Sequence, residues 1–205
     1  MQPWLLSAAA LAVDLPLSTQ GCESLEQLGE LRFTFNVESS GALKVSRAWI
    51  YRPKTREVVR TIEDDSISFT FGAPEGDEQT QADAQFINDS FWLMPQCHLS
   101  WASDATVTDR GTAPLPIGEG EAHKVTVRYA ADGGGYTPGD AYDLFVQDDR
   151  IVAWIYRRRA EDKPTMITTF TDYVPAGPLS VATEHVSEDG EFRLFFTDVA
   201  ASPSP

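Results

Sequence analysis

From residue 31 onward, apolar and polar residues alternate along most of the chain, and β-branched and aromatic residues dominate the runs. In the first run, Leu31, Phe33, Phe35 and Val37 fall on one face, which is typical of a strand with one buried side. Turn residues separate this run from the following ones. The pattern predicts about ten antiparallel strands, over residues 31–37, 43–51, 57–62, 66–71, 123–130, 142–147, 150–158, 166–174, 179–186 and 191–199.

The period changes over residues 81–94, where apolar residues recur every three or four positions. This spacing predicts a helix with an aromatic apolar side, and Pro95 ends it. The polar stretch that follows Trp101, with its prolines and glycines up to residue 122, predicts a long loop.

The run Ile151–Tyr156 is apolar on both faces, whereas a sheet open to water on one side shows a clean alternation. Some other element must cover the second face, and the aromatic helix is available for it. The predicted fold class is therefore mainly β with minor α: a curved antiparallel sheet, an incomplete β-barrel, wrapped around one or two helices.

The N-terminal region leaves two interpretations open. Residues 4–13 are apolar like the core of a signal peptide, but no Lys or Arg precedes them, so residues 1–17 are either a signal-like segment or an N-terminal helix. Gly21-Cys22 resembles a lipoprotein-processing site that lacks the apolar residue expected at Thr19. The alternative is an amphipathic helix over residues 18–28.

The expected organisation is a single half-barrel domain over residues 18–199 and a polar tail over residues 200–205, since all-β domains of this length form one unit. Acidic residues outnumber basic ones 31 to 16, for a net charge of −15, which excludes nucleic acid as a partner. Cys22 and Cys97 can pair in an oxidising compartment, but their spacing does not require it.

The sequence contains no phosphate-binding glycine loop and no motif of a hydrolase or zinc protease. Its three histidines, His98, His123 and His185, fall in different predicted elements. We therefore expect no metal, no cofactor and no catalytic residues.

The abundance of aromatic residues suggests a different role. Aromatic rings line cavities for apolar ligands, but they also fill cores, and the sequence does not separate these alternatives. The candidate ligand-binding residues are Phe33, Phe35, Trp49, Phe86, Phe91, Trp92, Trp154 and Tyr156.

Two acidic residues lie in apolar surroundings, Asp89 in the predicted helix and Asp140 at the start of a strand. A buried carboxylate requires a partner, for which Arg157, Arg128 and Tyr136 are the candidates. These groups would form a polar anchor at the mouth of a ligand cavity, a hydrogen-bonded clip between helix and sheet, or, in an alternative hypothesis, the site of a small-molecule enzyme.

Three segments carry a resemblance to a known family. A helix leading into residues 31–35, the strand pair 142–146 and 150–152, and the closing run 192–199 resemble the LolA/LolB-like lipoprotein-carrier superfamily of bacterial envelopes. The resemblance implies a non-enzymatic, monomeric protein that is periplasmic or associated with the outer membrane. It would bind a lipid, an acyl chain or another apolar small molecule between sheet and helix, and could associate peripherally with a membrane. A protein-binding module with an exposed sheet edge remains a further alternative.

Overall fold

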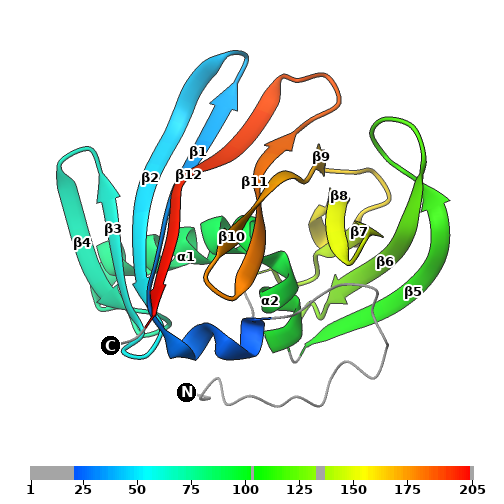
Figure 1. Ribbon diagram of the computed structural model, residues 1–205. Helices are drawn as coiled ribbons and strands as arrows, with labels where there is room; N and C mark the ends of the chain where they lie inside the picture. The colour runs from blue at the N-terminus through cyan, green and yellow to red at the C-terminus, as the bar shows by residue number, and fades with distance from the viewer. Residues whose placement is uncertain (1–20, 103, 133–136, 204–205) are drawn as a thin grey trace. The chain divides into compact units, whose positions relative to one another are not determined.

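The computed structural model describes residues 21–102, 104–132 and 137–203. Within them, twelve strands form two antiparallel sheets, neither of which closes on itself (Figure 1). The predicted fold class, mainly β with minor α, is confirmed, and the structure adds that the strands divide between two sheets. The chain likewise separates into two units, one of Gln20–Pro95, Thr171–His185 and Gly190–Pro205, and one of Gln96–Phe170 and Val186–Asp189.

The first unit contains a seven-stranded sheet in the order β10-β11-β12-β1-β2-β3-β4. Its strands are β1 (Leu28–Ser39), β2 (Ala42–Arg52), β3 (Glu57–Ile62), β4 (Asp65–Thr70), β10 (Thr171–Ala176), β11 (Leu179–Val186) and β12 (Phe192–Pro203). The short 3-10 helix η1 (Cys22–Gln27) leads into β1.

Register determines which side chains meet on this sheet. Phe33 of β1 pairs with Trp49 of β2, and Phe35 pairs with Arg47 of β2 on one side and with Phe196 of β12 on the other. Paired residues point to the same face of an antiparallel sheet. The alternating apolar positions of β1 therefore form a continuous aromatic face with their neighbours.

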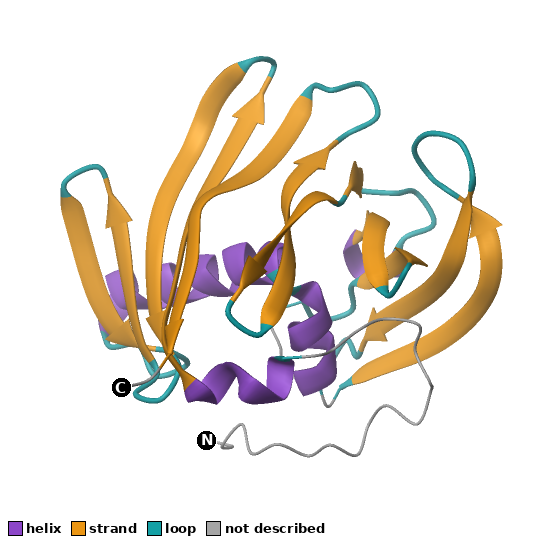
Figure 2. Ribbon diagram, viewed as in Figure 1, coloured by secondary structure: helices purple, strands orange, loops and turns teal. Residues whose placement is uncertain are grey.

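The helix α1 (Gly76–Leu93) packs on one face of this sheet (Figure 2). Contact of its Phe86 ring with Trp49 of β2 identifies that face as the aromatic one. Asp77 and Glu78 in its first turn interact favourably with the helix dipole. Its buried apolar residues include Phe86, Ile87 and Leu93, and the Phe86 ring contacts rings of β1 and β2. The helix begins five residues before the predicted start, because its first turn is polar and contributes nothing to the apolar period.

The second unit contains a five-stranded sheet in the order β5-β6-β7-β8-β9. Its strands are β5 (Ala105–Pro114), β6 (Glu121–Tyr129), β7 (Ala141–Gln147), β8 (Arg150–Arg157) and β9 (Met166–Thr169), accompanied by the short helices α2 (Pro95–Trp101) and η2 (Arg158–Ala160). The central strand β7 is buried on both faces from Ala141 to Val146. The sequence of Ile151–Tyr156, in the neighbouring strand β8, led us to expect burial on both faces, and β7 shows such burial.

The predicted boundaries are wrong in three places. The stretch expected to be a loop contains β5, an edge strand whose alternation is hidden by polar residues. The single strand predicted over residues 166–174 is divided at Phe170 into β9 and β10, which belong to different sheets. At the C-terminus, β12 continues to Pro203 through most of the predicted tail.

Both cysteines, Cys22 and Cys97, are disulfide-bonded. Where an amphipathic helix is expected over residues 18–28, the structure has only the 3-10 helix η1 (Cys22–Gln27), and Leu28 already belongs to β1. Residues 1–20, with the signal-like segment, lie outside the described residues. Among the helices of the described part, none is both long and apolar enough to cross a lipid bilayer.

Candidate functional site

The aromatic rings on the helix-facing side of the seven-stranded sheet form one connected cluster around Phe86 of α1. The Phe86 ring centroid lies 5.4 Å from that of Trp49, 5.2 Å from Tyr51 and 5.4 Å from Phe71. Its separation from Phe33 is 6.3 Å. Most of these contacts are edge-to-face or tilted, which is the arrangement that aromatic quadrupoles favour.

The cluster extends along the sheet through Phe196 of β12. The centroid of Phe196 lies 5.8 Å from both Phe33 and Phe35. Phe33 and Trp49 are 1% exposed, and Phe35 and Phe86 are 2% exposed. The space between α1 and the sheet is therefore occupied by these rings in this conformation.

Asp89 connects α1 to the sheet. Its carboxylate is 0% exposed and accepts two hydrogen bonds from Arg47 of β2, Nε to Oδ2 at 2.8 Å and Nη2 to Oδ1 at 2.7 Å. Trp49 Nε1 donates to Oδ2 at 2.8 Å, and Asn88 Nδ2 donates to Oδ1 at 3.0 Å. The Arg47 guanidinium in turn lies over the Phe35 ring, 4.9 Å from its centroid.

This arrangement has the geometry of a structural clip. Burial raises the pKa of the Asp89 carboxyl, and the hydrogen bonds from Arg47, Asn88 and Trp49 oppose that rise. Four donors already occupy the two oxygens, which leaves little capacity for a substrate. Of the roles considered for Asp89, the bond between helix and sheet is the one that the contacts support. Its main partner is Arg47, and the sequence did not indicate that residue.

The C-terminal turns of α1 carry the other two aromatic candidates, Phe91 and Trp92, both of which are half-buried. The Trp92 ring lies 5.4 Å from the ring of His185 of β11 and 6.3 Å from Phe192 of β12. His185 is fully buried and also contacts Phe196, at 5.8 Å. Trp92 therefore extends the aromatic cluster towards β11.

Trp154 and Tyr156 belong to the other unit, on β8. The ring of Tyr142 of β7 lies between them, 5.2 Å from Trp154 and 5.1 Å from Tyr156, and Tyr156 stacks on it nearly in parallel. Phe170 contacts Trp154 edge-on at 4.9 Å. Of the eight aromatic candidates, six therefore belong to the seven-stranded sheet and its helix α1, and two, Trp154 and Tyr156, belong to β8 of the five-stranded sheet.

Asp140 is hydrogen-bonded to Tyr156, one of the aromatic candidates on β8. Its Oδ2 accepts a hydrogen bond from the Tyr156 hydroxyl at 2.9 Å, and its Oδ1 accepts one from the backbone N–H of Arg159 at 2.8 Å. Burial, followed by the hydrogen bond to Asp140, raises the pKa of Tyr156 to about 12. The sequence proposed Arg157, Arg128 or Tyr136 as the partner. The observed partners are different, and Tyr136 lies outside the described residues.

Arg157 instead binds Asp143, on the opposite face of the five-stranded sheet from Tyr142. Arg157 Nη1 lies 2.6 Å and Lys124 Nζ 3.1 Å from the same oxygen, Asp143 Oδ2. The Thr126 hydroxyl donates to Oδ1 at 2.6 Å and accepts from Arg110 Nε at 3.2 Å. Burial opposes ionisation of Asp143, but Thr126, Lys124 and Arg157 outweigh it and lower its pKa.

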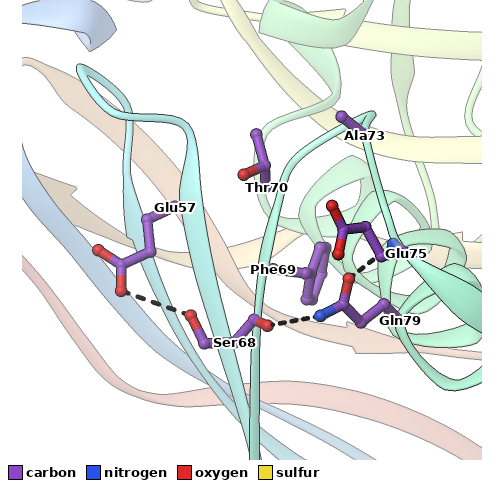
Figure 3. Close-up of a pocket in the computed structure, with 7 residues that line it drawn as sticks. All are labelled: Glu57, Ser68, Phe69, Thr70, Ala73, Glu75 and Gln79. Carbon is purple, nitrogen blue, oxygen red and sulfur yellow. Dashed lines mark hydrogen bonds between the residues drawn. The ribbon is translucent and has the colours of Figure 1, made fainter.

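A shallow polar pocket of about 340 Å³ lies at the β4 edge of the seven-stranded sheet (Figure 3). Gln79 of α1 crosses it, with its Nε2 donating to the backbone oxygen of Ser68 at 3.1 Å and its Oε1 accepting from the N–H of Glu75 at 2.6 Å. None of the aromatic or polar candidates from the sequence lines this pocket. Its residues are Glu57, Ser68, Phe69, Thr70, Ala73, Glu75 and Gln79.

Neither a protein-family model nor a curated protein matches this sequence. Among solved structures, the chain is similar to a DUF1329 family protein from Desulfovibrio piger, at 9% identity and a TM-score of 0.46. It is also similar to a LolA superfamily protein from Nitrosomonas europaea, at 8% identity and a TM-score of 0.44. Each similarity covers 88% of this chain and 88% of the other. The second structure belongs to the superfamily that the sequence resembles.

Proposed function

We propose that this is a non-enzymatic, monomeric protein that binds an apolar ligand, such as a lipid or an acyl chain. The ligand would occupy the aromatic face of the seven-stranded sheet by displacing ring contacts made by α1. The observation that carries the proposal is the continuous aromatic surface of Phe33, Phe35, Trp49 and Phe196 beneath a single helix.

The apolar attachment of the helix is concentrated in few groups, and Gln79 and Gln85 add polar bonds to β4 and β3. Its first half is largely polar and exposed, and the buried apolar side chains of its second half are Phe86, Ile87 and Leu93. An acyl chain in place of Phe86 would keep the sheet face covered by apolar atoms, so that the ligand would replace much of the lost contact area. The Asp89–Arg47 clip would act as a pivot during this exchange.

The disulfide-bonded state of Cys22 and Cys97 supports a location in the bacterial envelope. Disulfides persist in oxidising compartments such as the periplasm and are rare in the cytosol. Peripheral association with the outer membrane would follow from delivery of a lipid ligand. The apolar surface that contacts the ligand is covered in this conformation.

A contact-dependent quencher tests the proposal. Dibrominated stearate quenches tryptophan fluorescence only where bromine and indole meet, and Trp49 lies in the centre of the proposed site. We expect saturable quenching of the wild-type protein, reduced strongly in Trp49→Phe and retained in the matched variant Trp154→Phe. Trp154 is equally buried, but it lies on the other sheet.

Two results would overturn the proposal. One is the absence of saturable quenching by the brominated fatty acid together with no lipid in an organic extract of the protein purified from a bacterial envelope. The other is quenching that disappears in Trp154→Phe and persists in Trp49→Phe, since the ligand would then bind elsewhere.

A further inference from the structure

One face of the five-stranded sheet combines four cationic side chains with a single carboxylate among its described strand residues. The alternation of β6 places Lys124, Thr126 and Arg128 on the same face, and register sets Thr126 opposite Asp143 of β7. Arg157 of β8 and Arg110 of β5 reach the same group of residues from either side. We call Arg110, Lys124, Arg128 and Arg157 the cationic face.

The cationic face is organised around the buried end of Asp143, whose side chain is 7% exposed. Lys124 and Arg157 contact the same Asp143 oxygen, so their charged nitrogens converge on one point. One carboxylate cannot neutralise both of them together with Arg110, whose charge reaches it only through the Thr126 hydroxyl. Among the strand residues of this face, positive charges therefore outnumber negative ones, in a protein whose net charge is −15.

Donors remain available for a ligand. Lys124 and Arg157 are 26% and 21% exposed in their side chains, and each uses only part of its donor set on Asp143. Arg157 Nε has a further long contact to the carbonyl of Asp162 at 3.4 Å. Arg128 and Arg110 are exposed at the ends of the group. Arginine and lysine N–H groups are the donors that recognise phosphate oxygens.

We propose that the cationic face binds the phosphate group of a small soluble phosphate ester. A soluble phosphate ester is favoured over an anionic bilayer because the strong overall negative charge of the protein opposes approach to an extended anionic surface. This inference is independent of the apolar ligand proposed above, because it depends on a different sheet and on different residues.

Titration with glycerol 3-phosphate and inorganic phosphate, followed by two-dimensional NMR at constant ionic strength, tests the proposal. We expect saturable shifts of backbone amides in β6, β7 and β8, with chloride at equal ionic strength giving none. The double variant Arg110→Gln/Arg128→Gln leaves both cations on Asp143 in place and should keep the fold. It should weaken binding about tenfold, which corresponds to about 1.4 kcal/mol.

The matched control is Lys163→Gln, which removes an exposed cation from the same unit but not from the cationic face. It should bind as the wild-type protein does. Shifts that do not saturate, or that chloride reproduces, would overturn the proposal, as would an equal loss in Lys163→Gln. Binding to phosphatidylglycerol vesicles without binding of either soluble phosphate would also overturn it, by assigning the face to a lipid headgroup.

Discussion

At the scale of single residues, His98 of α2 couples the stability of the fold to pH. Burial lowers the pKa of its imidazole to about 4, whereas an unfolded chain titrates near its ordinary value of 6.5. As the pH falls from 6.5 towards 4, the unfolded state binds a proton that the folded state does not, so that the free energy of unfolding decreases.

We therefore predict that His98→Gln loses part of the acid sensitivity in this range. Its free energy of unfolding should change less than that of the wild-type protein between pH 7 and pH 5, by about 1–2 kcal/mol. Urea denaturation at the two pH values measures the difference. Equal pH dependence of the two proteins would show that His98 does not titrate abnormally, and His123→Gln, at a half-buried surface position, serves as the comparison.

The residue scale also shows why the partners of the two buried aspartates could not be predicted. Asp89 and Arg47 are separated by 42 positions and meet because strand register and helix placement bring them together. The sequence correctly indicates that a buried carboxylate needs a partner. It does not indicate which of several arginines supplies it, and Arg157 in fact belongs to Asp143.

At the scale of elements, the clip decides how firmly α1 stays on its sheet. Replacing Asp89 by Asn keeps the shape but leaves the half-buried Arg47 cation without a counter-charge. We expect a loss of about 3 kcal/mol in the free energy of unfolding, because removal of one partner of a buried ion pair is costly. Asp77→Asn, in the exposed first turn of the same helix, should cost less than about 1 kcal/mol.

Replacing both partners separates charge from packing. Arg47→Met/Asp89→Leu removes the charges together, and such changes are often neutral or stabilising. We expect this double variant to be more stable than Asp89→Asn in urea denaturation. If Asp89→Asn unfolds at the same urea concentration as the wild-type protein, the clip does not hold the helix.

Predictability of the elements depended on their place in each sheet. Inner strands such as β1 and β7 bury at least one face, so their apolar periodicity predicted them well. The edge strand β5 pairs on one side only and carries Asp109, Arg110 and Gly111 at an irregularity in its register. Nothing in its composition distinguished it from a loop, and the break at Phe170 was hidden because both flanking segments are β-like.

At the scale of the whole molecule, the disulfide-bonded state of the cysteines separates the two interpretations of Cys22. A lipoprotein anchor requires a thioether on this sulfur, whereas a disulfide consumes the same atom. We predict that protein isolated from the envelope resists alkylation by iodoacetamide until it is reduced, and that its intact mass then rises by two alkyl groups. In Cys97→Ser, Cys22 should react without reduction.

The free energy of unfolding of the protein should also depend on this disulfide. Loss of the disulfide in Cys97→Ser should lower the free energy of unfolding by about 2–4 kcal/mol, as judged by urea denaturation with and without reductant. A diacylglyceryl group on the Cys22 peptide, detected by mass spectrometry, would contradict this prediction and establish the lipoprotein interpretation.

The fold class could be predicted from the sequence because apolar periodicity reflects burial, and most strands of a mainly β protein bury at least one face. The division into two sheets could not, because it depends on hydrogen bonds between strands distant in sequence, such as β1 with β12. For the same reason, the sequence did not show that the aromatic candidates are divided between the strands of two sheets. Composition identifies the aromatic residues, but the strand topology determines to which sheet each of them belongs.

The Gln79 side chain has a consequence for self-association. An edge strand offers unpaired carbonyl and N–H groups that can template pairing with a strand of another molecule, the first step of many aggregation reactions. At β4 the carbonyl of Ser68 is already engaged by the Gln79 amide, and Glu57 and Glu75 place negative charges beside it. An incoming strand would have to displace the amide and approach two carboxylates, so we expect the polar groups of this pocket to oppose pairing of β4 with a strand of another molecule.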